Sequence, residues 1–382
     1  MDIIFIGQKG IPATTGGIER HVDNLAVQLA EKGHNVHVYT RSNYTDKNLK
    51  KYKGVNLISL PSVSTKHLDA ISHTFLACLD LIRRKADIIH FHSIGPSSLL
   101  WLAKLIKPNS KIIATFHSQC YYHQKWSLFA RLYLKFGEYI CCRFADKVIT
   151  VSKTLKKYTK QKYKINSFYI PNGVYSQKYS TPKAIKKKWD FRKNSYIVLV
   201  SRLIRHKGIH YAIEAYNKIK TNKKLVIVGS GFHTDSYSDY LKSIAKNNKN
   251  IIFTGNQSGS TLRELFSNAY CFIQPSENEG LSIALLEAMS FGTPVLVSNI
   301  PENKEAIAST GYIFKNKDIG SLAKKLSFML SNSAEVIRKG IEGKKRVEKF
   351  YNWNNITDEI VELYYESLKE KSLQIAKSYQ KA

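Results

Sequence analysis

The chain has 382 residues, of which 43% are hydrophobic and 12% aromatic, and its formal net charge is +30. This length suits two domains of about 150 to 200 residues, and the apolar content excludes a chain that stays disordered. The charge favours anionic partners such as nucleotide diphosphates, nucleic acid or an anionic lipid surface, although dispersed, solvated lysines would give the same excess.

The N-terminus is expected to be a strand and not a signal peptide, because Asp2 is acidic, the apolar run at 3–6 is short and Gly7 follows at once. No stretch reaches the roughly 18 consecutive apolar residues that a membrane span requires. The five cysteines form no Cys-x-x-Cys pair, so they predict neither a disulfide framework nor a zinc site. We therefore expect a cytoplasmic protein, with peripheral attachment to the inner face of the cytoplasmic membrane left open by the basic charge.

Short apolar runs alternate with helical stretches along the first half of the chain. A helix with an apolar stripe is expected at 18–32. The expected strands begin at Ile3, Asn35, Asp87, Lys111 and Lys147. Strands separated by helical spacing predict parallel βαβ units.

A turn signal, Pro171-Asn172-Gly173, and a basic connector mark the end of this first set. A second set of nearly continuous apolar strands follows, as expected for strands buried on both faces. Its strands begin at Tyr196, Lys224, Asn250, Tyr270 and Pro294. We predict an α/β protein with two Rossmann-like, doubly wound domains at 1–172 and 173–354, and a C-terminal helix at 355–382 that packs back on the first domain. Ligands of such sheets bind at the carboxyl ends of the strands, so a site is expected in the cleft between the two domains.

Three strand-end loops carry candidate binding residues. Gly16 and Gly17 open the first helix, where backbone N–H groups favour an anion; a simple tight turn is the alternative. Arg202 and Lys207 follow the first strand of the second domain and can grip a diphosphate, although a cation cluster is often only a solvated surface. The third loop is the segment Glu279-Gly280-Leu281-Ser282, which leads into a helix carrying Glu287.

In this third loop, backbone donors from 280 to 282 at a helix N-terminus suit phosphate or sugar hydroxyls. Glu287 is flanked by apolar residues, and a buried glutamate requires a partner such as a hydroxyl-rich ligand; a solvated helix face is the alternative.

Four motifs in order resemble glycosyltransferase family 4: Gly-Gly-x-Glu at Gly16, Pro-Asn-Gly at Pro171, Ser-Arg-Leu-x-x-x-Lys-Gly at Ser201 and Glu-x7-Glu at Glu279. The resemblance covers essentially the whole chain. Within the family, the chain most resembles bacterial rhamnosyl-type transferases of surface-polysaccharide assembly. This narrower resemblance lies in Gly10-Ile11-Pro12, His90-x-His92-x-x-Gly95-Pro96 and Lys125-Trp126.

The resemblance implies a GT-B fold and a role for each matching residue. Arg202 and Lys207 would neutralise the donor diphosphate, and Glu287 would take the ribose hydroxyls. Glu279 and the amides of Gly280, Leu281 and Ser282 would hold the transferred sugar. Gly16 and Gly17 would line the phosphates from the other domain.

His117 matches the family position that contacts the donor sugar near the reacting carbon, with strand capping as the structural alternative. Relatives commonly follow this histidine with Gly and then Asp, whereas this chain continues Ser118-Gln119-Cys120-Tyr121-Tyr122-His123. The acceptor pocket is therefore expected to differ from that of relatives.

The resemblance also implies transfer with retention of configuration. The sequence contains no Asp-x-Asp motif, so Arg202, Lys207 and a helix N-terminus are expected to stabilise the leaving diphosphate without a metal or other cofactor. No carboxylate stands out as a nucleophile, which favours same-face attack by the acceptor.

The acceptor is expected to be a glycan or lipid-linked glycan of lipopolysaccharide, capsule or exopolysaccharide. Basic and aromatic residues between 126 and 164 can rest on an anionic membrane, or can belong to ordinary core helices with lysines turned outward. Other GT-B enzymes, an epimerase or a phosphorylase, remain alternatives. A nucleic-acid-binding protein is disfavoured, because no recognised nucleic-acid-binding motif is present and the lysines are dispersed.

Overall fold

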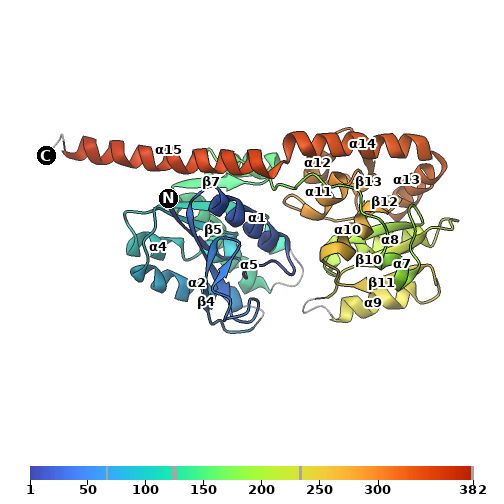
Figure 1. Cartoon of the computed structure of the whole chain (residues 1–382), viewed down its shortest axis with the longest axis horizontal. Coiled ribbons are helices and arrows are strands. Elements are labelled where there is room, and N and C mark those ends of the chain that lie inside the picture. The colour runs from blue at the N-terminus through green and yellow to red at the C-terminus, as the bar shows by residue number, and fades with distance from the viewer. Residues whose placement is uncertain (66–67, 123–126, 232–234, 380–382) are drawn as a thin grey trace. The chain divides into compact units, whose positions relative to one another are not determined.

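The computed structural model describes residues 1–65, 68–122, 127–231 and 235–379 (Figure 1). The chain forms two compact units, Met1–Asn172 together with Trp353–Ala382, and Gly173–Asn352. The C-terminal helix α15 (Trp353–Tyr379) begins ahead of the expected start at residue 355, and so the second unit ends earlier than predicted. In the described part of the chain, no helix is both long and apolar enough to cross a membrane.

The first unit is built on one sheet. Its strands are β1 (Asp2–Ile6), β2 (Asn35–Arg41), β3 (Lys51–Tyr52), β4 (Val55–Leu60), β5 (Ile88–His92), β6 (Lys111–Phe116), β7 (Lys147–Thr150) and β8 (Phe168–Tyr169). They lie in the order β3-β4-β2-β1-β5-β6-β7-β8, and all neighbours are parallel except β3 and β4. The sequence pattern did not predict β3, β4 or β8.

Helices cover both faces of this sheet. They are α1 (Gly17–Glu31), α2 (Asp69–Asp80), the 3₁₀ turn η1 (Leu81–Arg83), α3 (Ile94–Ser97), α4 (Leu100–Ile106), the 3₁₀ turn η2 (Cys120–Tyr122), α5 (Leu128–Phe144), α6 (Lys153–Tyr163) and α15. Side chains alternate along β1: Ile3 and Phe5 pack in the core under α1 and α15, whereas Ile4 and Ile6 pack in the core under α2, α4 and α5. Figure 1 shows α15 running beside α1.

The second unit repeats this design. Its strands are β9 (Tyr196–Val200), β10 (Lys224–Val228), β11 (Ile251–Gly255), β12 (Cys271–Gln274), β13 (Val295–Ser298) and β14 (Tyr312–Phe314). All pairs are parallel, in the order β11-β10-β9-β12-β13-β14. The helices are α7 (Ala184–Trp189), the 3₁₀ turn η3 (Arg205–Lys207), α8 (Ile209–Tyr216), α9 (Asp235–Ala245), α10 (Gly259–Ser267), α11 (Ile283–Ser290), α12 (Pro301–Ile307), α13 (Ile319–Ser331) and α14 (Ser333–Phe350). The predicted fold class, α/β with two Rossmann-like domains, is confirmed.

Strand order selects the loops that can form a site. In the first sheet the chain moves outward from β1 through β2, then returns to place β5 on the other side of β1; in the second sheet β9, β10 and β12 repeat this pattern. Open parallel sheets bind ligands at the carboxyl ends of strands where the order reverses. The loops after β1 and β5, and those after β9 and β12, occupy these positions.

Candidate functional site

The loop after β9 lies against the end of β12. Gly208 has a φ of 68°, and a Cβ at this position would collide with the backbone carbonyl oxygen of Pro275. The N–H of Glu277 donates to the carbonyl of His206 at 2.8 Å. Because glycine permits this close approach, two loops that are distant in sequence become neighbours.

This approach joins two of the predicted donor-binding residues. Lys207 Nζ donates to Glu279 Oε1 at 2.6 Å, and the side chains are only 17% and 9% exposed. Arg202, in the same loop as Lys207, is exposed. The two predicted cations therefore differ: Lys207 is held by a carboxylate, whereas Arg202 reaches solvent.

The start of α11 is fixed by a hydrogen-bond network. Ser282 Oγ accepts from the N–H of Leu285 at 3.3 Å as the N-cap, and donates to Gln274 Oε1 at 2.6 Å. Gln274 Nε2 in turn donates to Asn303 Oδ1 at 2.7 Å. The Ser282 hydroxyl thus positions the helix N-terminus, where the helix dipole favours an anion. The sequence had suggested only a binding role for this segment.

Glu287 lies in the second turn of α11 and is half-buried, although Leu285, Leu286, Ala288 and Met289 around it are fully buried. A partly accessible carboxylate on an otherwise apolar helix is compatible with the predicted contact to ligand hydroxyls.

Glu302 is a titratable residue of this region that the sequence did not single out. It lies in the first turn of α12, after β13, and is 8% exposed. Burial, together with the charges of Glu279 and Glu305, raises the pKa of its carboxyl to about 7. Its only sequence signal is its place directly after Pro301 and close to a strand end, which is too common to indicate a site.

In the first unit, Gly16 caps α1 with a φ of 99°, and a Cβ there would collide with the carboxylate of Glu19. Glu19 Oε1 also accepts from the N–H of Lys9 at 3.2 Å. Gly17 is the first residue of α1. The glycine pair therefore opens a helix as expected, and Glu19 occupies the inside of the turn.

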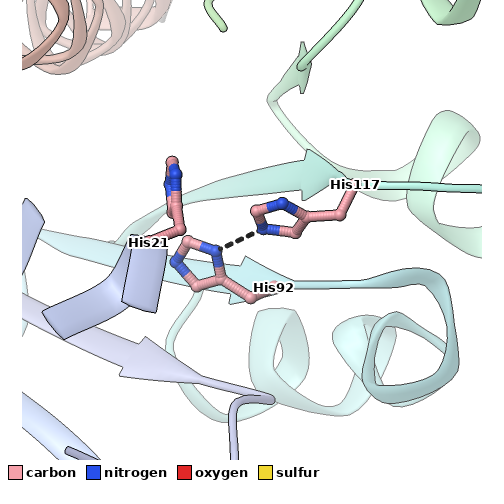
Figure 2. Close-up of side chains that lie close together, drawn as sticks. All are labelled: His21, His92 and His117. Atoms are coloured by element: carbon pink, nitrogen blue, oxygen red, sulfur yellow. Dashed lines mark hydrogen bonds between the residues drawn. The ribbon is translucent and has the colours of Figure 1, made fainter. Parts of the chain in front are cut away.

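The same unit gathers three histidines at the ends of its central strands. His21 comes from α1, His92 ends β5 and His117 follows β6; they are 2%, 0% and 7% exposed. Figure 2 shows the hydrogen bond between His92 Nδ1 and His117 Nε2, 3.1 Å long. The ring of His21 packs edge-on against that of His117, with centroids 4.9 Å apart. His117 is therefore part of a cluster, which the sequence did not predict.

The three imidazoles are neutral at physiological pH. Burial is the main cause: it lowers the pKa of His21 to about 4 and holds the pKa values of His92 and His117 well below the usual range. His90 stacks on His92, and its two nitrogens bond to the hydroxyls of Tyr364 at 2.6 Å and Thr115 at 2.7 Å. His90 therefore fixes the orientation of His92.

The predicted residues fall into two groups. Arg202, Lys207, Glu279, Gly280, Leu281, Ser282 and Glu287 belong to the second unit, and Gly16, Gly17 and His117 belong to the first. The residues His123, Lys125 and Trp126, named in the sequence comparison with relatives, lie outside the described residues.

Comparison with known proteins identifies the class of protein to which this chain belongs. Residues 15–178 match the model described as Glycosyltransferase Family 4, and residues 182–350 match Glycosyl transferases group 1. Two parallel-sheet units with these matches define a glycosyltransferase of the GT-B fold. More narrowly, the two matches together support a glycosyltransferase of family 4, because the first unit matches the Glycosyltransferase Family 4 model and the second unit matches the group 1 model.

Individual relatives are distant, and they cover different shares of the chain. An uncharacterized glycosyltransferase of Methanocaldococcus jannaschii is 28% identical over 396 residues, covering 95% of this chain and 98% of the relative. The capsular polysaccharide biosynthesis glycosyltransferase CapM of Staphylococcus aureus is 26% identical over 243 residues, 59% of this chain and 63% of CapM. The structure of Anabaena HepE in complex with UDP-glucose aligns with a TM-score of 0.80 and 17% identity, over 96% of this chain and 100% of HepE.

Proposed function

We propose that this glycosyltransferase moves a sugar, with retention of configuration, from a nucleotide diphosphate donor to a glycan or lipid-linked glycan in surface-polysaccharide biosynthesis. The single observation that carries the proposal is the Lys207–Glu279 ion pair beside the N-terminus of α11, with Arg202 exposed in the same loop. The similarity to CapM supports the polysaccharide context, and the likeness to HepE supports the GT-B fold.

The ion pair suits the chemistry of the leaving group. A departing nucleotide diphosphate gains negative charge, and stabilising that charge lowers the barrier more than other available effects. Arg202 can bind the diphosphate from solution. The Lys207 ammonium can then donate hydrogen bonds both to Glu279 and to phosphate oxygens. Glu279, still held beside Lys207, is placed to accept hydrogen bonds from the transferred sugar, and Glu287 from the ribose.

His117 acts as a neutral hydrogen-bonding group toward the sugar in this proposal. Its low pKa makes an imidazolium unavailable near neutral pH, and a neutral imidazole has one donor and one acceptor nitrogen. Neither Glu279 nor Glu287 is assigned as a nucleophile, so the acceptor attacks on the face from which the diphosphate leaves.

A donor screen tests the proposal. Purified protein is incubated with UDP-, GDP-, ADP- and dTDP-linked hexoses and deoxyhexoses, dTDP-rhamnose included, and release of nucleoside diphosphate is measured with and without oligosaccharide acceptors. We expect one donor class to give acceptor-dependent release and a product whose NMR spectrum shows the anomeric configuration of the donor. An inverted product would contradict retention, and epimerised free sugar in place of a glycoside would favour an epimerase.

The outer face of the α2, α4 and α5 layer suggests where the protein contacts the membrane that would carry a lipid-linked acceptor. Helix α5 exposes Leu128, Phe129, Leu132 and Phe136 by 75%, 81%, 56% and 49%, and α4 exposes Leu105 by 70%. The cations Arg131, Lys135 and Arg143 of α5 are also exposed, whereas Glu138, its one acidic residue, is fully buried. Apolar side chains interleaved with unopposed cations complement an anionic bilayer, and we propose that this face rests on one.

Vesicle sedimentation tests this contact at low salt. Leu128→Ser with Phe129→Ser should reduce binding to vesicles containing anionic phosphatidylglycerol. Ile337→Ser with Ile341→Ser is a matched control, because both isoleucines are 53% exposed in α14 of the second unit. Equal loss in both double variants, or no binding by the unchanged protein, would contradict the membrane contact.

A further inference from the structure

The histidine cluster of the first unit has the composition of a metal site. One imidazole nitrogen from each of His21, His92 and His117 lies within 4.8 Å of the other two. Figure 2 shows that the three side chains come from α1 and from the ends of β5 and β6, so rigid elements hold them together. We propose that these histidines bind one transition-metal ion of the zinc class, and that the bound ion inhibits sugar transfer.

The distances require only a modest movement. Zn–N bonds of about 2.1 Å in a tetrahedral site place two nitrogens roughly 3.4 Å apart. His92 Nδ1 and His117 Nε2 are already 3.1 Å apart. His21 must therefore approach this pair by about an ångström.

The protonation state favours a metal. Metal ligands must be neutral imidazoles, and binding normally competes with protons. Here burial keeps all three rings neutral, so the ion need not displace a proton from an imidazolium. His90 stacks on His92, so a neighbouring ring orients one of the ligands.

The donor set also selects the ion. Imidazole nitrogens suit Zn²⁺, Cu²⁺, Ni²⁺ and Fe²⁺, whereas Mg²⁺ and Ca²⁺ prefer oxygen ligands. Three protein ligands leave a position open for water, as in an accessible zinc site. His90 is not a fourth ligand, because both of its ring nitrogens are engaged by Tyr364 and Thr115.

Inhibition follows if His117 contacts the donor sugar, and this part of the inference rests on the proposed function. The ion takes the His117 nitrogen that faces His92 and places positive charge in the cluster. With Nε2 bound to the ion, Nδ1 must carry the ring proton, so His117 can no longer accept a hydrogen bond from a sugar hydroxyl. The binding part stands without any enzymatic activity.

Direct metal titration tests the binding of the ion separately from its inhibition of sugar transfer. Tag-free protein is stripped of metal and titrated with Zn²⁺ against a chromophoric chelator, and with Co²⁺ while its visible absorption is recorded. We expect one ion per chain and the intense bands of tetrahedral Co²⁺. His21→Gln and His92→Gln should each weaken Zn²⁺ binding by about 100-fold or more.

His73→Gln is the matched control. His73 is also fully buried in the first unit, with its pKa lowered to about 4, but it lies outside the cluster. Its affinity for Zn²⁺ should equal that of the unchanged protein. Equal affinities in all four proteins would overturn the site, as would the absence of stoichiometric binding.

Two further measurements keep the test decisive. If a glutamine variant does not fold, imidazole ¹⁵N shifts of the unchanged protein should move for three histidines on Zn²⁺ addition; movement of exposed histidines alone would overturn the site. In the transfer assay, nucleoside diphosphate release should fall as Zn²⁺ occupancy rises and recover with EDTA. Stoichiometric binding with full activity would refute the inhibitory role alone.

Discussion

Lys207 and Glu279 form a 2.6 Å ion pair between the loops after β9 and β12. Lys207→Ala should lower kcat/KM by about 100-fold or more, because it removes a cation from the leaving diphosphate and leaves Glu279 unpaired. Steady-state kinetics with the identified donor measure this. Lys242→Ala is the control, since Lys242 pairs with Asp239 on the exposed surface of α9. A loss of similar size in both variants would refute the special role of Lys207.

Gly208 should be intolerant of a side chain. Gly208→Ala adds a Cβ that meets the carbonyl of Pro275, and so it must displace the loop that carries Lys207. Gly255→Ala is matched in backbone conformation, with a φ of 67°, but its Cβ has nothing within 4 Å. In urea unfolding, Gly255→Ala should lower the free energy of unfolding by on the order of 1 kcal/mol, because alanine is strained in the left-handed conformation. Gly208→Ala should lower it by more. Equal costs would mean that the approach to Pro275 is unimportant.

Glu302 should make stability depend on pH. Its folded pKa of about 7 lies above the ordinary value of 4.5, so between these values the folded state keeps a proton that the unfolded state has lost. Stability therefore falls as pH rises through this window. Glu302→Gln removes the penalty and should raise the melting temperature at pH 8 more than at pH 5, by about 2–4 °C for each kcal/mol recovered. A pH-independent difference between the two proteins would show that Glu302 is ionised normally.

The buried histidines should make the first unit sensitive to acid. His21, His73, His90, His92 and His117 all have lowered pKa values in the folded protein. Below pH 6.5 the histidines of the unfolded chain bind protons, whereas these buried rings stay neutral in the folded protein. The free energy of unfolding therefore falls progressively as pH drops toward 4. Each ring contributes a loss on the order of 1 kcal/mol at pH 5.5.

Hydrogen exchange measured by mass spectrometry can show which of the two units loses stability in acid. Corrected for intrinsic exchange, peptides of β5 and β6 should lose protection between pH 7 and pH 5 before peptides of β9 and β12 do. Simultaneous loss in both units would contradict the histidine explanation.

Transfer itself should proceed without a metal. EDTA should leave the activity of metal-free protein unchanged and should raise the activity of protein preloaded with Zn²⁺. Loss of activity with EDTA that Mg²⁺ restores would contradict the metal-independent mechanism, and it would leave the Zn²⁺ titration unaffected.

Much of the fold followed from local patterns. Runs such as those beginning at Ile3, Lys111 and Tyr196 are continuous and apolar because their strands are buried on both faces, and these runs became β1, β6 and β9. The strands β3, β4, β8 and β14 were missed; β3, β8 and β14 have only two or three residues, which carry no readable period. The start of α15 at Trp353 was also missed; this tryptophan is fully buried in the core of the first unit, a tertiary contact that the local pattern does not reveal.

Local sequence by itself determined that two Rossmann-like units exist and which strand-end loops carry glycines, cations and carboxylates, because turn chemistry and apolar period act over a few residues. Tertiary structure decided which of those groups touch. The pairing of Lys207 with Glu279, the raised pKa of Glu302 and the gathering of His21, His92 and His117 all depend on strand order. A parallel sheet brings the ends of strands together regardless of their distance along the chain, and burial then sets their charge.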